Sequence, residues 1–317
     1  MLRELVMLSV GLAVAAVRTG AVPEESAHRD HVPTAVSVAG QTRDTASVLR
    51  EMRVALGGEA ALDAIRSFTV DGSVRQTASG FTKDLPMELF VLLPDHFLDI
   101  RRDSQSVGPR TVDITYYKGF RGDTLIRRTD STIPFPPDPW PQVPAVIAQR
   151  EREMMAANKQ DFARLALLLF GRSFDGYVLQ FQHLGAVQRE GHAIDVLEAT
   201  AADGFRMRLS VDATTHLPAA LDYLAPQGMM VSMTSTVIVR GREVVSEIPT
   251  ASPAPVDTAG RPMVEHRLAP SNFRVQHGVN WPHRLTETVG TQVVSQTNLG
   301  KFRLNPKLEL RRFDIVR

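Results

Sequence analysis

The sequence predicts a mainly β (α+β) protein, largely antiparallel, that folds around one apolar interior. Two patterns predict the strands: apolar and polar residues alternate in short runs after residue 67, and turn residues separate those runs. Composition is the third observation. Hydrophobic residues make up 43% and charged residues 22% of the 317, which is ordinary for a globular chain with a sizeable core.

The amino-terminal segment has the layout of a secretory signal. Arg3 precedes an apolar run at residues 5–17, and small residues follow, with Ala15 and Ala21 as candidate cleavage points. A bilayer-spanning helix needs about 20 apolar residues, so this run is a poor anchor. We expect a signal peptide at 1–21, a flexible leader at 22–44, and a mature periplasmic chain that is not an integral membrane protein. The alternative is a short amphipathic or buried first helix.

Charge and cysteine content exclude several kinds of partner and site. Thirty-six basic and 35 acidic side chains leave a formal charge of +1, so no strong field draws the chain to nucleic acid or to an anionic membrane. The sequence has no cysteine, which excludes disulfides, thiolate metal sites, a cysteine nucleophile and lipidation on cysteine. We expect no nucleic-acid partner.

Two stretches have helical spacing. At 45–65, Val48, Met52 and Leu56 recur at helical steps, and the glycine pair at 57–58 predicts a break between two short helices. At 143–171, apolar residues recur at three- and four-residue steps, which predicts the longest helix of the chain. The charged run at 150–153 is interpreted as a solvated face of that helix.

Two proline-rich segments interrupt the pattern. Residues 133–144 hold six prolines and 249–262 hold four, and proline lacks the N–H that a helix interior or central strand needs. We interpret the first as an ordered loop or lid and the second as an elaborated loop. The strands after it total only about 55 residues, too few for an independent core, so one domain is expected over 45–317.

The strands are expected in two groups. The first begins at residue 68 and includes a hairpin turn at 119–122, so Arg121-Gly122-Asp123 is interpreted as turn residues and not as an adhesion motif. In the second group the alternation is cleanest at 205–211, where one face is apolar. The other strands of this group are expected at 177–183, 186–189, 192–199, 217–223, 229–239, 264–273, 279–289, 291–304 and 308–315.

No sequence motif indicates catalysis or metal binding. None of the nine histidines belongs to a His-Glu-x-x-His pair, and no nucleophile elbow, phosphate loop or dinucleotide fingerprint is present. An enzyme would need a polar constellation that converges in a pocket, and the acidic residues show no paired arrangement. We expect no enzyme, no metal and no cofactor.

The candidate binding residues are apolar and lie on the expected strands. Met207, Met229 and Met233 fall on strands that we expect to be neighbours, and methionine lines surfaces that fit varied apolar ligands. Plain core packing is the alternative. Alternation fixes which residues share a face but not which face is concave. The residues expected to line an apolar cavity are Leu89, Val91, Met207, Leu209, Met229 and Met233.

Several local patterns together indicate a family. A helix at 52–65 runs into a strand at 68–76, followed by the step Leu93-Pro94-Asp95-His96-Phe97 and the aromatic-glycine hairpin Tyr116-Tyr117-Lys118-Gly119. Residues 209–218 and the ending 302–313, with Asn305-Pro306, add to these. In this order of elements most of 45–317 resembles the LolA-like outer-membrane lipoprotein carriers.

This resemblance implies a curved antiparallel sheet, an incomplete β-barrel with covering helices. Its concave face would bind the acyl chain of a lipid or lipoprotein, and the protein would act as a carrier or chaperone. Leu93 stands where the carriers have a basic residue before the proline, and the chain is long for a minimal carrier. The alternative function is a periplasmic regulator or scaffold that senses envelope lipids or lipoproteins through contact with an envelope protein.

Overall fold

A computed structural model describes residues 43–78, 81–107, 109–133, 143–226, 233–239, 242–248 and 263–315. Most of its strands belong to one antiparallel sheet. These are β1 (Ser67–Ala78), β2 (Phe81–Leu92), β3 (His96–Val107), β4 (Arg110–Arg121), β5 (Thr124–Ser131), β6 (Leu179–Arg189), β7 (His192–Ala201), β8 (Arg206–Asp212), β9 (Pro218–Pro226), β12 (Met263–Gln276), β13 (Val279–Val289) and β14 (Gln292–Leu304).

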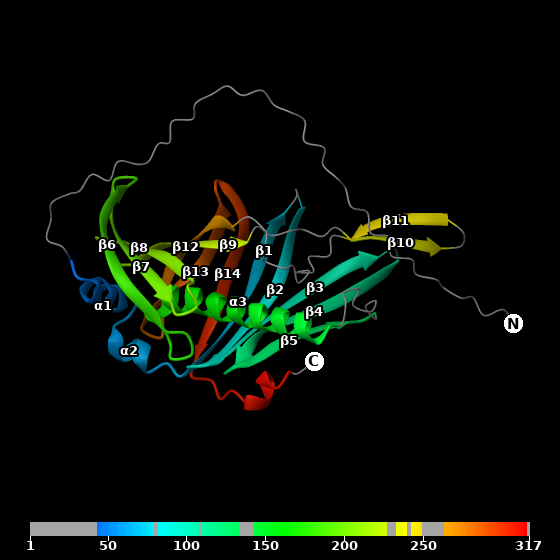
Figure 1. Ribbon diagram of the computed structural model, residues 1–317, viewed down its shortest axis with the longest axis horizontal. Coiled ribbons are helices and arrows are strands. Elements are labelled where there is room, and N and C mark those ends of the chain that lie inside the picture. Colours follow the sequence, from blue (N-terminus) through cyan, green and yellow to red (C-terminus); the bar gives the residue numbers. More distant parts are fainter. Residues whose placement is uncertain are drawn as a thin grey trace, which may run out of the picture.

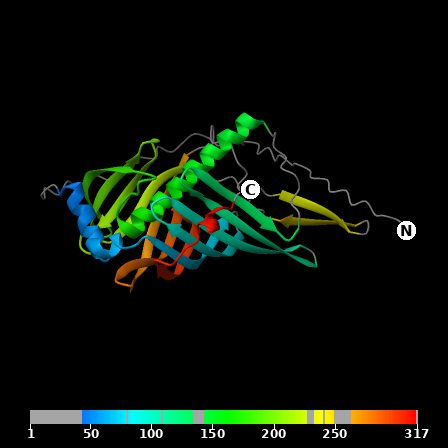
Figure 2. The same ribbon diagram turned by 90° about the horizontal axis from the view of Figure 1, so that it is seen from below.

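The sheet is curved and open. Its twelve strands have the order β5-β4-β3-β2-β1-β14-β13-β12-β9-β8-β7-β6, and β5 and β6 are its two edges within the described residues. Helix α3 (Pro144–Phe170) lies across the concave face (Figures 1 and 2). The expected fold class is confirmed: a mainly antiparallel sheet, curved and incompletely closed, with a covering helix.

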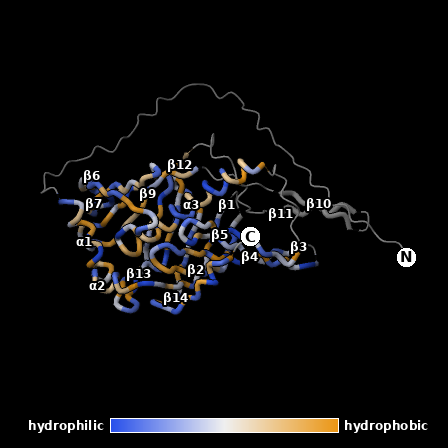
Figure 3. Tube along the Cα trace, turned by 60° about the horizontal axis from the view of Figure 1, so that its bottom comes forward, coloured by the Kyte–Doolittle hydropathy of each residue, from blue (hydrophilic) through white to orange (hydrophobic). Residues whose placement is uncertain are grey.

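The last strands join the two halves of the sheet. β14 lies antiparallel to β1, where Phe68 is opposite Leu304 and Val70 is opposite Phe302. On its other side β14 pairs with β13, which leads through β12 to β9. β9, which precedes the second proline-rich segment in the sequence, and β12, which follows it, therefore belong to one sheet. Figure 3 shows apolar and polar residues alternating along the strands, as a sheet with one buried face requires.

Two short helices precede the sheet, as the glycine pair predicts. α1 (Thr45–Ala55) is capped by Asp44, which accepts the backbone N–H three residues ahead at 2.6 Å. α2 (Glu59–Asp63) follows after Gly57, whose φ is 133°. A Cβ at this position would lie 2.6 Å from the carbonyl oxygen of Gly278. Because only glycine fits there, the break between the helices is fixed by the contact with the sheet.

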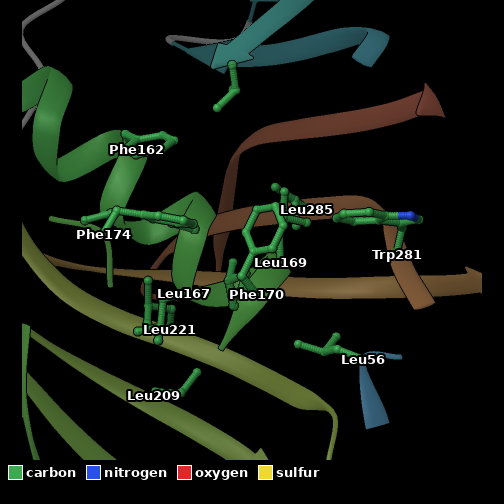
Figure 4. Packing of buried hydrophobic residues seen from close by; sticks show 14 of the residues in the cluster. Leu56, Phe162, Leu167, Leu169, Phe170, Phe174, Leu209, Leu221, Trp281 and Leu285 are labelled. Atoms are coloured by element: carbon green, nitrogen blue, oxygen red, sulfur yellow. The ribbon is translucent and has the colours of Figure 1, made fainter. Parts of the chain in front are cut away.

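The long helix begins and ends as predicted. Pro144 occupies its first turn, and Gly171 ends it in the left-handed conformation at φ 62°. Its carboxyl-terminal half is buried against the sheet, and Figure 4 shows Phe170 close to Trp281 and Leu285. The buried apolar residues of this half are Phe162, Ala163, Ala166, Leu167, Leu168, Leu169 and Phe170.

Aromatic rings hold this end of α3 on the concave face. The ring of Phe170 lies 5.6 Å from that of Phe68 on β1 and 5.7 Å from that of Trp281 on β13. Trp281 stacks on Phe302 of β14 with ring centres 4.4 Å apart. All four side chains are fully buried, so the helix and the first and last strands share one close-packed core.

The end of the chain differs from the prediction. A strand was expected at 308–315, but the structure has the 3₁₀ helix η1 (Leu310–Phe313). Asn305, with φ 50°, turns the chain at the end of β14, and its side chain accepts the N–H groups of Arg66 and Ser67. Phe313 is then buried on the convex face beside Phe90 of β2. The apolar residues at 308–315 therefore cover a second small core and add no strand.

A second difference concerns the strand expected at 229–239. The structure has β10 (Met233–Val239), which pairs only with β11 (Arg242–Ile248) in a separate two-stranded sheet. β11 was not predicted. The neighbours of β8 are instead β7 and β9, so the expectation that Met233 lies on a strand next to Met207 is wrong.

Candidate functional site

Four of the predicted cavity residues are buried in one apolar cluster. Leu89 and Val91 of β2, and Met207 and Leu209 of β8, are at most 5% exposed and belong to the same apolar cluster as Phe170. Met233 is the first residue of β10, and Met229 lies outside the described residues. The cluster that holds these four residues also contains the buried half of the helix. Their role in ligand binding stays a prediction.

A large groove follows the other half of α3. It encloses about 1510 Å³ and is bounded by the helix from Pro144 to Lys159, by the start of β5, and by residues 176–178 and 201–203. Figure 2 shows the amino-terminal half of α3 rising away from the sheet at this place. Apolar side chains line much of the groove, namely Leu125, Ile147, Met154, Met155 and Val178. None of the four core residues described above is among its lining residues.

The wall formed by α3 also carries charge. Arg150, Glu151 and Arg152 line the groove, so the charged run at 150–153 is part of a cavity wall and not merely a solvated face. The sequence pattern predicted the helix but not what the helix faces, because the opposite walls come from segments distant along the chain.

The inner end of the groove is polar. Lys159 donates a 2.8 Å hydrogen bond to Asp123 in the β4–β5 turn, and the Tyr177 hydroxyl donates one of 2.8 Å to Asp203. The hydrogen bond from Lys159 lowers the pKa of Asp123. Burial, followed by the hydrogen bond to Asp203, raises the pKa of Tyr177. The groove thus combines an apolar stretch with charged groups at one end.

One partly buried carboxylate accepts three hydrogen bonds, a cluster that the sequence analysis missed. Glu287 of β13 accepts hydrogen bonds from the Tyr223 hydroxyl at 2.6 Å, from Nδ1 of His266 at 2.8 Å and from the Ser295 hydroxyl at 3.0 Å. Burial alone would raise the pKa of Glu287, but these hydrogen bonds outweigh it and lower the pKa to about 2. Nε2 of His266 is buried and has no hydrogen-bond partner among the described residues.

Polar contacts also fix the middle of α3 to both sides of the sheet. The guanidinium of Arg164 lies over the Tyr223 ring, and Asp161 pairs with Lys118 of β4. Asn158 donates a 2.9 Å hydrogen bond to the carbonyl oxygen of Gly119. We call the set Lys118, Asn158, Asp161, Arg164, Tyr223 and Glu287 the polar belt. It lies between the buried half of α3 and the half that borders the groove.

A smaller cavity of about 510 Å³ lies between α1 and the β8–β9 turn, lined in part by Glu51 and His216. In the described parts of the chain, no three histidine, aspartate or glutamate side chains are placed to hold a metal ion. No helix of those parts has the length and apolar character needed to cross a membrane.

Comparison with family models gives no match, and the search of curated proteins gives none either. Solved structures do resemble this one. A LolA superfamily protein from Nitrosomonas europaea has a TM-score of 0.44 at 13% identity, covering 86% of this chain and 98% of its own. A putative outer membrane lipoprotein-sorting protein domain from Vibrio parahaemolyticus has 0.41 at 13%, covering 84% and 95%.

A DUF1329 family protein from Desulfovibrio piger has a TM-score of 0.43 at 10% identity, covering 86% of this chain and 98% of its own. The name of the first of these structures includes LolA, and that of the second refers to outer membrane lipoprotein sorting. At these values none of them indicates what this chain binds, so the function has to be argued from the groove itself.

Proposed function

We propose that this chain is a periplasmic carrier or chaperone that binds the acyl chain of a lipid or lipoprotein. The acyl chain occupies the groove between the amino-terminal half of α3 and the β5 edge of the sheet. The observation that carries the proposal is the groove itself, with its volume of about 1510 Å³ and the large apolar side chains of Leu125, Ile147, Met154, Met155 and Val178 in its lining. Pockets for small ligands typically enclose roughly 300–1,000 Å³, so this groove has room for a larger amphiphile.

Burial of the acyl chain supplies the binding free energy. Each methylene removed from water contributes about 0.8 kcal/mol, so several methylenes against Leu125, Ile147 and Met155 offset the cost of ordering a flexible chain. Methionine suits such a surface because its thioether side chain adapts to ligands of varied shape. Met154 and Met155 both line the groove.

The cavity residues predicted from the sequence would form a second binding position, which the acyl chain reaches after the groove. Leu89, Val91, Met207 and Leu209 are buried in the apolar core that also contains the carboxyl-terminal half of α3. An acyl chain would reach them only if that core opened. Binding in the groove needs no such movement, and for that reason we place the acyl chain there first.

Native mass spectrometry with solvent extraction tests the proposal on protein purified from the periplasm without detergent. The expected result is acyl lipid bound at near one-to-one ratio. The variant Ile147→Gln places a polar side chain in the groove wall, and burial of its unpaired amide against an acyl chain weakens binding. This variant is expected to lose most of the bound lipid.

Val146→Gln is the matched control. Val146 neighbours Ile147 on α3, is 40% exposed, and does not line the groove. The control variant is expected to retain lipid at the wild-type ratio. Equal lipid content in both variants, or a folded wild-type protein without any lipid, would contradict the proposal.

A further inference from the structure

At the charged end of the groove, Lys159 and Asp123 form an ion pair in which one side chain is much more exposed than the other. The side chain of Lys159 is 19% exposed, whereas that of Asp123, its hydrogen-bond acceptor, is 97% exposed. An ammonium group held in the wall of a groove therefore has its counter-ion on a solvent-exposed hairpin turn. Exposed ion pairs are weak, because water and salt screen them and the side chains lose entropy.

An anion that enters the groove can take the place of Asp123. The ammonium of lysine has three donors, and the structure gives Lys159 one side-chain acceptor. A ligand anion next to Lys159 is shielded from water by the groove walls, which strengthens the attraction between the two charges. Asp123 can then rotate into solvent at little cost.

The charges that line the groove, those of Lys159 and Asp123 included, are nearly balanced. Its lining has four basic side chains, Arg127, Arg150, Arg152 and Lys159, and three acidic ones, Asp123, Glu151 and Asp203. Asp203, on the opposite wall, accepts hydrogen bonds from Tyr177 at 2.8 Å and from Gln160 at 3.5 Å. When Asp123 turns away, the remaining side chains carry a net positive charge that favours an anion.

The apolar stretch begins directly beside Lys159. Met155 lies one helical turn before it on the same face of α3, and Leu125 lies two residues after Asp123 on the opposite wall. From Lys159 back to Pro144 the helix extends about 22 Å, at 1.5 Å per residue. This length suits a long acyl chain whose head group is at Lys159.

Building on the function proposed above, we infer that the groove selects amphiphiles with one negatively charged head group, a carboxylate or a phosphate. Lys159 binds the head group in place of Asp123, and the acyl chain extends along α3 toward Pro144. Lys159 thus determines the class of ligand, and Asp123 competes with the ligand for the same ammonium group.

The test compares dodecanoate, dodecyl phosphate and dodecanol as competitors of the fluorescent apolar probe phenylnaphthylamine on the full chain. Wild-type protein is expected to bind both anions more tightly than the alcohol. Lys159→Met keeps the length of the side chain but removes its charge. It is expected to weaken dodecanoate binding by about tenfold or more, as loss of a charge-assisted hydrogen bond does, with dodecanol binding unchanged.

Asp123→Asn gives the opposite change. The variant removes the competing charge from an exposed turn, so dodecanoate is expected to bind more tightly than to wild type. Lys301→Met is the matched control, because Lys301 is an exposed lysine on β14 outside the groove. Binding of all three ligands to this control is expected to equal that of the wild type.

The outcomes separate this inference from the function on which it rests. Tighter binding of dodecyl phosphate than of dodecanoate assigns the head group as phosphate, and the reverse order assigns it as carboxylate. If dodecanol binds as tightly as the anions and Lys159→Met changes none of them, the charge selectivity is wrong while acyl binding stands. If no ligand displaces the probe, both fail.

Discussion

The guanidinium carbon of Arg164 lies 4.1 Å from the ring centre of Tyr223. This contact joins the middle of α3 to β9, on the side of the sheet opposite β4. Because Tyr223 also donates to Glu287, the helix is connected through one ring to a partly buried carboxylate on β13. The position of α3 therefore depends on polar contacts as well as on apolar packing.

Loss of the contact between Arg164 and Tyr223 is expected to weaken the attachment of α3. Arg164→Met keeps much of the apolar stem but removes the cation, which lies over the Tyr223 ring and also pairs with Asp161. A desolvated cation–π contact alone contributes about 1–2 kcal/mol, so urea unfolding should show a decrease of at least this size in the free energy of unfolding. The exposed Arg206 on β8 provides the control variant Arg206→Met. Equal stability of both variants would contradict this assignment.

Glu287 is expected to make the protein sensitive to acid. Its pKa is lowered from 4.5 to about 2 in the folded protein, so the carboxylate stabilises the fold above the unfolded-state pKa. That stabilisation is lost as the pH falls from about 4.5 toward 2, and the shift corresponds to about 3 kcal/mol at neutral pH. Glu287→Gln should lower stability at pH 7 and flatten its decline in this window. Stability curves with identical acid slopes would contradict it.

Substitutions of Met207 are expected to change the stability of the protein as substitutions of a buried core residue do. It is 1% exposed and pairs with Tyr223 and Ala199 on the adjacent strands. Met207→Asp buries an unpaired charge at a cost of several kcal/mol and should unfold the chain, whereas Met207→Leu preserves volume and should cost less than about 1.5 kcal/mol. Thermal unfolding followed by circular dichroism distinguishes them. A folded Met207→Asp protein would show that this position borders open space.

Gly119 is expected to tolerate no side chain. A Cβ there would lie 1.9 Å from the carbonyl oxygen of Phe97, on the strand that pairs with it. Gly119→Ala must displace β3 from β4 and should cost about 3 kcal/mol or more. Gly176→Ala is a suitable control, because the nearest atom to its Cβ would be 3.8 Å away. Similar melting temperatures for the two variants would contradict the close approach of these strands.

Local signals in the sequence predicted much of the fold. The glycine pair after Leu56 and Gly171 at the end of α3 mark helix ends, where a residue type is tied to one backbone conformation. Alternation located most strands of the large sheet, because one face of most of them faces the apolar core. The prediction of a strand at 308–315 was wrong. The apolar residues of this segment cover the convex face of the sheet, and alternation alone cannot distinguish such a covering segment from a strand that pairs within the sheet.

The candidate site was much less predictable. Tyr223 and Glu287 are 64 positions apart in the sequence, and their meeting depends on the order of β9, β12 and β13. The groove likewise needs α3, β5 and residues 201–203 in one place. No local pattern encodes such proximity. Alternation placed Met207 and Leu209 on one face, but it could not show that this face is already buried in the core of the protein.

Photo-crosslinking is the most direct test of where the acyl chain binds. A dodecanoate analogue with a diazirine at its chain end is irradiated with the protein, and the modified peptides are identified by mass spectrometry. We predict adducts on the amino-terminal half of α3, around Ile147 and Met154, that excess dodecanoate suppresses. Adducts confined to the peptides that contain Leu89 or Met207, or adducts that excess dodecanoate does not suppress, would contradict binding in the groove.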